Sequence, residues 1–188
     1  EDLTVAINVN EISQLNKRLH HANDQLKEIA HTDSLTQVWN RYRIEQAIDA
    51  ELSAAERYDR PCSILLFDVD HFKHVNDEHG HEVGDIVLKR LTSEVEKQLR
   101  ATDFLGRWGG EEFIVLASNN MLEEAGNLAE RLRKHIASIN FTDVGKVTIS
   151  IGVAQWRTGE SRRYMLERAD KAMYQAKQSG RNRVELSE

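Results

Sequence analysis

The sequence has a single cysteine, a single proline and only ten glycines among its 188 residues. Because Cys62 has no second cysteine to pair with, an internal disulfide and a cysteine-based zinc site are both excluded, and a reducing compartment is the simplest interpretation. No apolar run approaches the roughly 20 residues that a membrane-spanning helix needs. The longest runs, 64–67 and 113–117, have the length of strands. With so little Gly and Pro, no flexible linker is evident either.

The sequence also has fewer basic than acidic residues, and its formal net charge is -6. This balance argues against an unspecific electrostatic grip on nucleic acid or on an anionic membrane, but it leaves open a local basic patch for a phosphate-bearing ligand. The length suits one domain with an appendage. The chain begins at Glu1 rather than Met, so we expect an upstream segment to have been removed.

The N-terminal 30 residues carry a narrow apolar stripe. Its members recur at alternating steps of three and four with polar residues between them: Ile12, Leu15, Leu19, Ala22, Leu26 and Ile29. That spacing is typical of the a and d positions of a coiled coil. We therefore predict a signalling and dimerisation helix over residues 1–30, ahead of a domain at 31–188. A helix that packs on its own domain is the alternative that this pattern leaves open.

Downstream of residue 31, stretches of helical and of strand periodicity are mixed. Helices are expected around 44–55, 87–99, 122–136 and 162–178, and strands at 63–67, 104–108, 112–117, 147–156 and 184–186. This order contains the βαββαβ arrangement of ferredoxin-like folds, with additions. The sequence therefore predicts an α+β domain of the ferredoxin-like or palm type, in which helices flank a mostly antiparallel central sheet.

The first acidic motif is Phe67-Asp68-Val69-Asp70, where an apolar strand ends in two carboxylates. Residues i and i+2 project from the same face of a strand, so Asp68 and Asp70 are expected to reach one site. Carboxylate oxygens at a strand end suit Mg²⁺, which binds one or two carboxylates together with substrate phosphates. A turn or a helix cap is the commoner reason for this pattern when it occurs alone.

The second acidic motif is Gly109-Gly110-Glu111-Glu112, between two expected strands. Glycines at the tip of a hairpin supply positive φ, and they also let another molecule approach the backbone closely. The two acids that follow place carboxylates at that point of approach. A solvated turn explains the motif equally well when it is taken alone.

A polar stretch from Asn76 to Asp85 is the third candidate. Amide and carboxylate side chains can pair with the edge of a purine, and a carboxylate that accepts from both N1–H and the exocyclic amine selects guanine. The alternative is a polar loop followed by a helix that begins near Gly84. Four histidines, at positions 71, 74, 79 and 81, raise the question of zinc, but their spacing matches no common zinc pattern.

Two cations, Lys177 and Arg181, lie four residues apart at the end of the last expected helix. A compact cationic pair of this kind is suited to gripping phosphates. The same pair also interacts favourably with the C-terminus of a helix, which requires no ligand.

Together these motifs resemble the GGDEF family of diguanylate cyclases over about residues 33–186, and their combination is highly specific. Asp33-Ser34-Leu35-Thr36 with Asn40-Arg41 is similar to the family's opening D-x-L-T-x-L-x-N-R, with Val38 where Leu is usual. Residues 67–85 follow F-D-x-D-x-F-K-x-x-N-D-x-x-G-H-x-x-G-D throughout. Residues 109–113 read GGEEF, an active variant of the signature, and residues 169–182 match the closing motif.

The resemblance implies roles for these positions. Asp68, the backbone carbonyl of Val69 and Glu111 would bind Mg²⁺, for which Mn²⁺ can substitute. Asp68, Glu111 and Lys73 would form the catalytic centre. The substrate GTP would be bound by Phe72, Asn76, His81, Asp85, Gly109, Gly110, Lys177 and Arg181. Asp70 and Glu112 would support these groups.

The implied reaction is nucleotidyl transfer between two GTP molecules, one in each monomer of a homodimer. The 3′-hydroxyl of each GTP attacks the α-phosphorus of the other, which releases two pyrophosphates and gives cyclic di-GMP. Metal ions stabilise the attacking and leaving oxygens, and Glu111 would help to remove the hydroxyl proton. Neither half-site closes the ring alone, so we expect pairing through the helix at 1–30 and through the facing sites.

The family context also implies a location and a larger assembly. We expect a cytoplasmic part of a larger bacterial signalling protein, whose upstream sensor could be tethered to a membrane. No direct contact of this fragment with membrane or nucleic acid is expected, in keeping with its net charge.

A product-binding site is implied by Arg100-Ala101-Thr102-Asp103, which ends five residues ahead of the GGEEF motif. This offset resembles that of the family's RxxD inhibitory site. An arginine fork suits bidentate recognition of guanine or phosphate, and Arg131 on the following helix would contribute. We therefore expect cyclic di-GMP to bind as an allosteric inhibitor at Arg100, Asp103 and Arg131.

Three other interpretations remain open. A non-catalytic member of the family would bind GTP or cyclic di-GMP as a receptor, but such members usually lose the signature acids or the phosphate cations that are present here. A coiled-coil scaffold, whose globular end is only a dimerisation cap, predicts that removing Glu111 changes nothing measurable. A polymerase or nucleotide-cyclase palm is an analogy of fold alone, and a preference for guanine would separate it.

Overall fold

The computed structural model describes residues 11–19, 22–23 and 31–187. The chain divides into two compact units, Glu1–His31 and Thr32–Glu188. No helix within the described ranges is both long and apolar enough to cross a membrane.

In the first unit, residues 11–19 are helical, and the apolar stripe is exposed at Ile12, Leu15 and Leu19. The last two positions of the predicted coiled-coil stripe, Leu26 and Ile29, lie outside the described residues. The dimerisation helix over the first 30 residues therefore stays a prediction.

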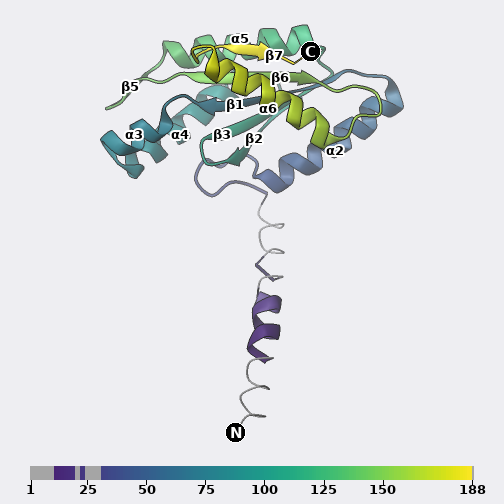
Figure 1. Cartoon of the computed structure of the whole chain (residues 1–188), viewed down its shortest axis with the longest axis horizontal. Coiled ribbons are helices and arrows are strands. Elements are labelled where there is room, and N and C mark those ends of the chain that lie inside the picture. Colours follow the sequence, from purple (N-terminus) through teal and green to yellow (C-terminus); the bar gives the residue numbers. More distant parts are fainter. Residues whose placement is uncertain (1–10, 20–21, 24–30, 188) are drawn as a thin grey trace. The chain divides into compact units, whose positions relative to one another are not determined.

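The second unit is built around a five-stranded sheet with the order β2-β3-β1-β6-β7 (Figure 1). Its strands are β1 (Cys62–Val69), β2 (Asp103–Gly109), β3 (Glu112–Ser118), β6 (Ile149–Gln155) and β7 (Val184–Leu186). The central strand β1 pairs antiparallel with β3 and β6, and β2 pairs antiparallel with β3, whereas β7 runs parallel to β6. The predicted βαββαβ core is therefore present with one added strand, and the expectation of a mostly antiparallel α+β sheet is confirmed.

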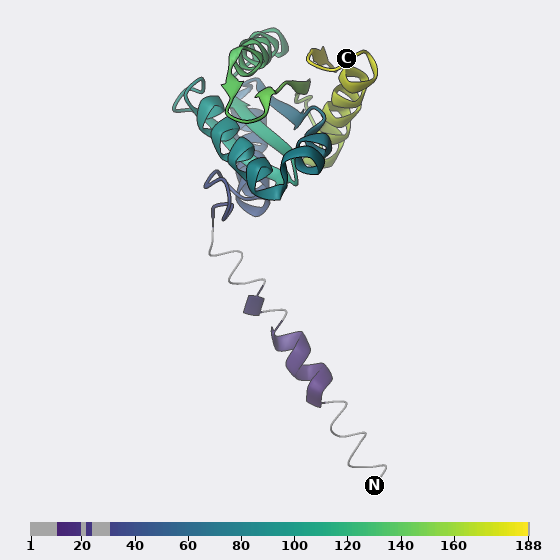
Figure 2. The same cartoon turned by 90° about the vertical axis from the view of Figure 1, so that its left-hand side faces the viewer.

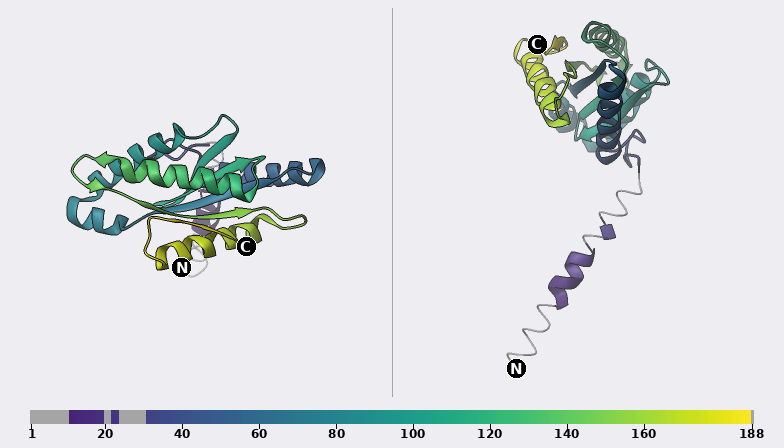
Figure 3. Two further views of the ribbon diagram at one scale, coloured as in Figure 1. Left: turned by 90° about the horizontal axis from the view of Figure 1, so that it is seen from above. Right: turned by 90° about the vertical axis from the view of Figure 1, so that its right-hand side faces the viewer.

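Helices cover both faces of the sheet, as Figures 1 and 3 show. They are α2 (Arg41–Tyr58), α3 (Phe72–His79), α4 (His81–Glu96), α5 (Leu122–Ser138) and α6 (Arg162–Gln178). Helices α4 and α5 bury their apolar sides against one face, and α2 and α6 against the other. The side view in Figure 2 shows the strands between these helices. A separate short hairpin, β4 (Asn140–Phe141) and β5 (Gly145–Lys146), connects α5 to β6.

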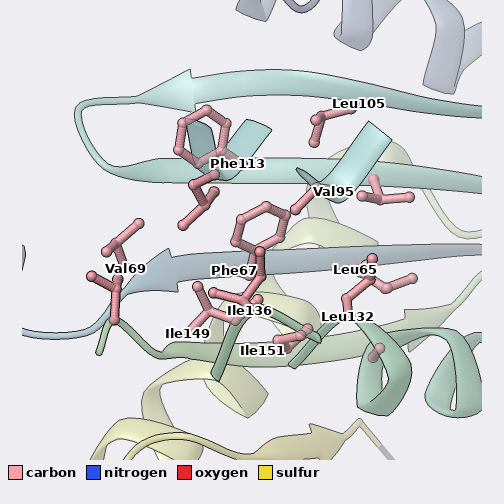
Figure 4. Close-up of a cluster of buried hydrophobic side chains, with 14 of the residues drawn as sticks. Leu65, Phe67, Val69, Val95, Leu105, Phe113, Leu132, Ile136, Ile149 and Ile151 are labelled. Atoms are coloured by element: carbon pink, nitrogen blue, oxygen red, sulfur yellow. The ribbon is translucent and has the colours of Figure 1, made fainter. Parts of the chain in front are cut away.

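The central strand shows why the sheet has two apolar faces. Every residue of β1 is buried, and alternate side chains point to opposite faces. Phe67 belongs to the cluster under α4 and α5 and packs on Phe113, with the ring centroids 5.5 Å apart (Figure 4). Ile64 and Leu66 belong to the cluster against α2 and α6. Asp68 continues this second series, so it emerges on the α6 side of the sheet at the end of the strand.

The segment after β1 forms the helix α3, so the polar loop that the sequence left open as an alternative for this segment is wrong. Its buried residues Phe72 and Val75 are three positions apart and share one side of a helix. The other residues of α3 are polar, so the sequence shows too little apolar periodicity to predict the helix. Gly80, at a φ of 86°, ends α3 and precedes α4, which begins at His81 rather than near Gly84. Strand β1 also continues two residues beyond its predicted end.

Candidate active site

Three segments come together at one end of the sheet: the end of β1 with α3, the β2–β3 turn, and the C-terminal end of α6 (Figure 1). The register of the sheet aligns them, because Asp68 on β1 pairs with Glu112 on β3 and with Ser150 on β6. Lys177 reaches the same place from the last turn of α6, with its Nζ atom 3.0 Å from Oδ2 of Asp68. The structure therefore brings together the acidic strand end, the acidic turn and one predicted phosphate cation.

The carboxylate of Asp68 lies in an excess of negative charge. The pKa of Asp68 is raised to about 6, chiefly by burial and also by the charges of Glu111 and Glu112, against the lowering effect of Lys177. Burial also raises the pKa of Glu112, which Lys177 lowers in part. Lys177 thus acts on both Asp68 and Glu112, and Arg41 also lowers the pKa of Glu112. A bound cation would add to this compensation of the acidic groups.

Arg107 holds the shape of the β2–β3 turn. The strand pairing is irregular after Arg107, and Gly110 has a positive φ of 52°. The guanidinium of Arg107 donates two hydrogen bonds, of 2.9 and 2.8 Å, to the carbonyl oxygen of Gly110 and a third, of 3.0 Å, to Oδ1 of Asp33. Beyond the turn, the carbonyl of Glu111 accepts a 3.3 Å hydrogen bond from the N–H of Val69. Arg107 is not among the site residues that the sequence predicts. The only feature of the sequence that points to it is its place two residues before the paired glycines.

Asn76 on α3 lies directly against Gly84 on α4. A Cβ atom at Gly84 would stand 1.9 Å from Oδ1 of Asn76 and 3.2 Å from the ring of Phe72, so only glycine leaves room for the Asn76 amide. Asp85, the next residue of α4, and His81, at the start of that helix, are both exposed. The predicted guanine-binding side chains therefore lie on two adjoining helices.

Asp70 has different partners from Asp68, although the sequence pattern predicts one shared site. Its carboxylate accepts 2.6 Å hydrogen bonds from the hydroxyls of Thr148 and Ser150 and a 3.0 Å hydrogen bond from the N–H of Asn182. These donors engage both oxygens of a side chain that is 5% exposed. Asp70 therefore anchors the chain that follows α6 to β6, and a supporting role in the reaction stays a prediction.

The other two predicted phosphate cations are exposed. Lys73 lies in the first turn of α3, and Arg181 follows the end of α6. Within the described part of the chain, Lys73 and Arg181 form no ion pair, in contrast to Lys177. The ammonium group of Lys73 and the guanidinium group of Arg181 are therefore available to an anion.

The oxygen atoms at the end of β1 suit a hard divalent cation. Asp68, Glu111 and the carbonyl of Val69 are the kinds of donor that Mg²⁺ prefers. Burial, which is the main reason for the raised pKa of Asp68, disfavours its charged form until a cation is bound beside it. Among residues 11–19, 22–23 and 31–187, no three His, Cys, Asp or Glu side chains are gathered around one point. Two carboxylates completed by substrate phosphates therefore fit this chain better than an all-protein metal cage.

A second site lies beside the connection from α4 to β2. A cavity of about 180 Å³ is lined by Arg100, Asp103, Asn120, Glu124, Asn127, Leu128 and Arg131. Oδ2 of Asp103 accepts a 3.0 Å hydrogen bond from the N–H of Arg100, whereas its buried Oδ1 has no partner within the described residues. The structure thus brings the three predicted product-binding residues to one cavity and leaves a buried acceptor atom unused.

The sequence is similar to one family model and to several known proteins. The family model of the diguanylate cyclase GGDEF domain matches residues 30–183. Diguanylate cyclase DgcP of Pseudomonas aeruginosa is 39% identical over 183 residues, which cover 95% of this chain and 27% of DgcP. The response regulator PleD of Caulobacter vibrioides is 41% identical over 167 residues, which cover 86% of this chain and 37% of PleD. The chain therefore spans well under half the length of these relatives.

Solved structures share the fold. The GGDEF domain of DgcB from Caulobacter crescentus, in complex with c-di-GMP, has a TM-score of 0.80 at 33% identity and covers 84% of this chain and 96% of that domain. Diguanylate cyclase SiaD from Pseudomonas aeruginosa, in complex with its activator SiaC, has a TM-score of 0.81 at 34% identity, covering 98% of this chain and 73% of SiaD. With the motifs assembled at one end of the same sheet, the chain belongs to the GGDEF domain family of diguanylate cyclases.

Proposed function

We propose that this chain condenses two GTP molecules into cyclic di-GMP and two pyrophosphates. The observation that carries the proposal is the assembly at the end of β1, where Asp68 lies 3.0 Å from Lys177 and within the electrostatic reach of Glu111. Carboxylates and a cation beside a turn with exposed glycines suit a nucleoside triphosphate that arrives with a metal ion. The similarity to named diguanylate cyclases supports the same reaction.

Asp68, the carbonyl of Val69 and Glu111 would hold Mg²⁺, or Mn²⁺ in its place. When bound, the metal stabilises negative charge on the reacting phosphate oxygens. The chain's own contribution is to present two carboxylates from a strand end and a turn that are joined by the hydrogen bond between Val69 and Glu111.

Asn76 and Asp85 would bind the edge of guanine, with His81 and Phe72 beside them. The carboxylate of Asp85 can accept from N1–H and from the exocyclic amine, a pair of donors that adenine does not offer on that edge. Gly84 keeps the Asn76 amide in place against α4, because a larger residue would displace it.

The triphosphate would lie along the β2–β3 turn. Gly109 and Gly110 leave the backbone of the turn open to close approach, since no atom would meet a Cβ at either position within 4 Å. Lys73, Lys177 and Arg181 would neutralise the phosphates, Arg181 through its two-pronged guanidinium.

Glu111 would take the proton from the 3′-hydroxyl of the bound GTP as that oxygen attacks the α-phosphorus of the GTP in a facing subunit. The bond between the α-phosphorus and its bridging oxygen breaks, and pyrophosphate leaves. The reciprocal step closes the ring, so the active unit is a homodimer. Residues 1–30 would hold two copies together and raise the effective concentration of one half-site near the other.

Cyclic di-GMP would also bind in the cavity of Arg100, Asp103 and Arg131 and inhibit the enzyme. The arginine forks suit phosphate and guanine oxygens, and Arg100 and Arg131 line the same cavity. The complex of the DgcB domain with c-di-GMP supports a product site in a similar domain.

The test is incubation of the chain with GTP and Mg²⁺, followed by chromatography of the nucleotides. Cyclic di-GMP should form with the native chain and with the control Glu123→Gln, which neutralises an exposed acid on α5. Glu111→Gln should lower the rate at least about 100-fold, and a chelator should do the same. Equal rates for Glu111→Gln and the native chain would refute the proposal. A native chain that forms no product but binds cyclic di-GMP would instead support the alternative of a non-catalytic receptor for cyclic di-GMP.

A further inference from the structure

The chain that follows α6 has an unusual backbone. Gly180, Arg181 and Asn182 have φ values of 112°, 61° and 46° in succession. The N–H of Arg181 donates a 3.0 Å hydrogen bond to the carbonyl of Ala176, which is a common way to end a helix and accounts for Gly180. It does not account for the next two residues, because a left-handed conformation costs a non-glycine residue about 1 kcal/mol or more.

Two contacts hold Asn182 in this conformation. On one side, the buried carboxylate of Asp70 accepts its N–H at 3.0 Å. On the other, Nη1 of Arg133 on α5 donates to Oδ1 of Asn182 at 2.7 Å and to its carbonyl oxygen at 3.3 Å. Asparagine suits this position, since it tolerates the left-handed region better than most residues and its side chain supplies the acceptor that Arg133 uses.

The guanidinium of Arg133 is itself fixed. Its Nε and Nη2 atoms donate to the two oxygens of Glu130, at 2.8 and 2.7 Å, and its side chain is 17% exposed. This fork leaves Nη1 directed at Asn182. Lys134, the next residue, also approaches Glu130, at 3.5 Å, but its side chain is 68% exposed and it does not bond to Asn182 within the described residues.

We propose that Arg133 is a positioning residue for Arg181. The proposal rests on the function above, in which Arg181 binds the triphosphate. Arg181 stands between the end of α6 and the held Asn182, so the direction of its side chain depends on a turn that would otherwise relax to a commoner backbone conformation. By holding Asn182 in place, Arg133 fixes the backbone from which the Arg181 side chain extends, without touching the nucleotide itself.

The test measures the dissociation constant of 3′-deoxy-GTP, which binds but cannot be joined, by calorimetry with Mg²⁺ present. Arg181→Gln should raise Kd about tenfold, since it removes a charged phosphate ligand. Arg133→Gln should raise Kd about fivefold, because the turn loses a charge-assisted hydrogen bond. Lys134→Gln removes a cation from the same helix and the same Glu130, and its Kd should stay within about twofold of the native value. In the Arg181→Gln background, Arg133→Gln should add nothing.

The outcomes separate the two proposals. If Arg181→Gln raises Kd but Arg133→Gln does not, or if the two effects multiply, the positioning role is wrong while the proposed function stands. If Arg181→Gln leaves Kd unchanged, the phosphate-binding role of Arg181 fails, and the positioning proposal fails with it. Asn182→Gly tolerates a positive φ and removes the acceptor of Arg133, so it should also raise Kd several-fold. If circular dichroism shows that Arg133→Gln is unfolded, Asn182→Gly takes its place in the comparison.

Discussion

Asp68 lies near the end of strand β1 and Asp70 directly follows that strand, yet the surroundings of the two carboxylates are opposite. Asp70 accepts from two hydroxyls and one backbone N–H. Asp68 has one cation, Lys177, at 3.0 Å, and its pKa is raised to about 6 by burial, against Lys177, and by neighbouring carboxylates. The carboxylate with a full set of donors holds the fold together, whereas the one left with excess negative charge is prepared for a ligand. A place on a strand therefore does not assign a role; the donors around the side chain do.

The largest effect that separates the two aspartates should be on activity. Asp68→Asn removes a proposed metal ligand, and we expect the rate of cyclic di-GMP formation to fall by about 100-fold to 1,000-fold. The same change removes a buried negative charge from an acidic cluster, so the free energy of unfolding should rise by about 1–2 kcal/mol at pH 7.5 without metal. Chromatography of the products and urea unfolding measure the two quantities. A loss of both activity and stability would show that Asp68 is structural and would remove the contrast with Asp70.

Asp70→Asn should have the opposite profile. Its amide offers one acceptor where three donors converge, so the free energy of unfolding should fall by about 2–3 kcal/mol. Urea unfolding measures this, with Asp143→Asn as the control, because Asp143 is exposed and its φ of 69° suits asparagine. The folded variant should keep more activity than Asp68→Asn. A stability equal to that of the control would contradict the anchoring role.

These contrasts also mark how far the sequence predicts the site. Asp68, Glu111 and Asn76 belong to short contiguous motifs, and strand alternation places Asp68 at the end of a buried strand without a structure. The groups that hold the site come from remote parts of the chain. Asp33 and Arg107 are 74 residues apart, and Asp70 and Asn182 are 112 apart. No local pattern encodes such contacts, because they join segments that only the folded chain brings together.

The fold shows the same division between local and tertiary signals. Strands β1, β3 and β6 and helix α6 follow from periodicity and composition. Helix α3 cannot be predicted in this way, because only Phe72 and Val75 of its eight residues are buried and most of the others are polar. Its helical state depends on packing beside α4, where Gly84 leaves space for Asn76. Tertiary contact therefore decides the structure where the local apolar signal is weakest.

The smallest expected effect is a dependence of stability on pH that comes from Asp68. Because the pKa of Asp68 is raised from 3.8 to about 6 in the folded chain, the folded state binds this proton more tightly than the unfolded chain does. The contribution of Asp68 to stability should therefore fall as pH rises from about 4 to about 6, by roughly 2 kcal/mol in total, and stay constant above that window.

Urea unfolding of the native chain and of Asp68→Asn between pH 4 and pH 8, in a chelator, isolates this effect, because other titrating groups cancel in the difference. The advantage of Asp68→Asn should grow through the window and then level off. Saturating Mg²⁺ should reverse the trend for the native chain alone, since a cation bound to ionised Asp68 stabilises the folded state. A difference that does not change with pH would mean that Lys177 compensates the charge of Asp68 fully, and the contrast with Asp70 would then rest on activity alone.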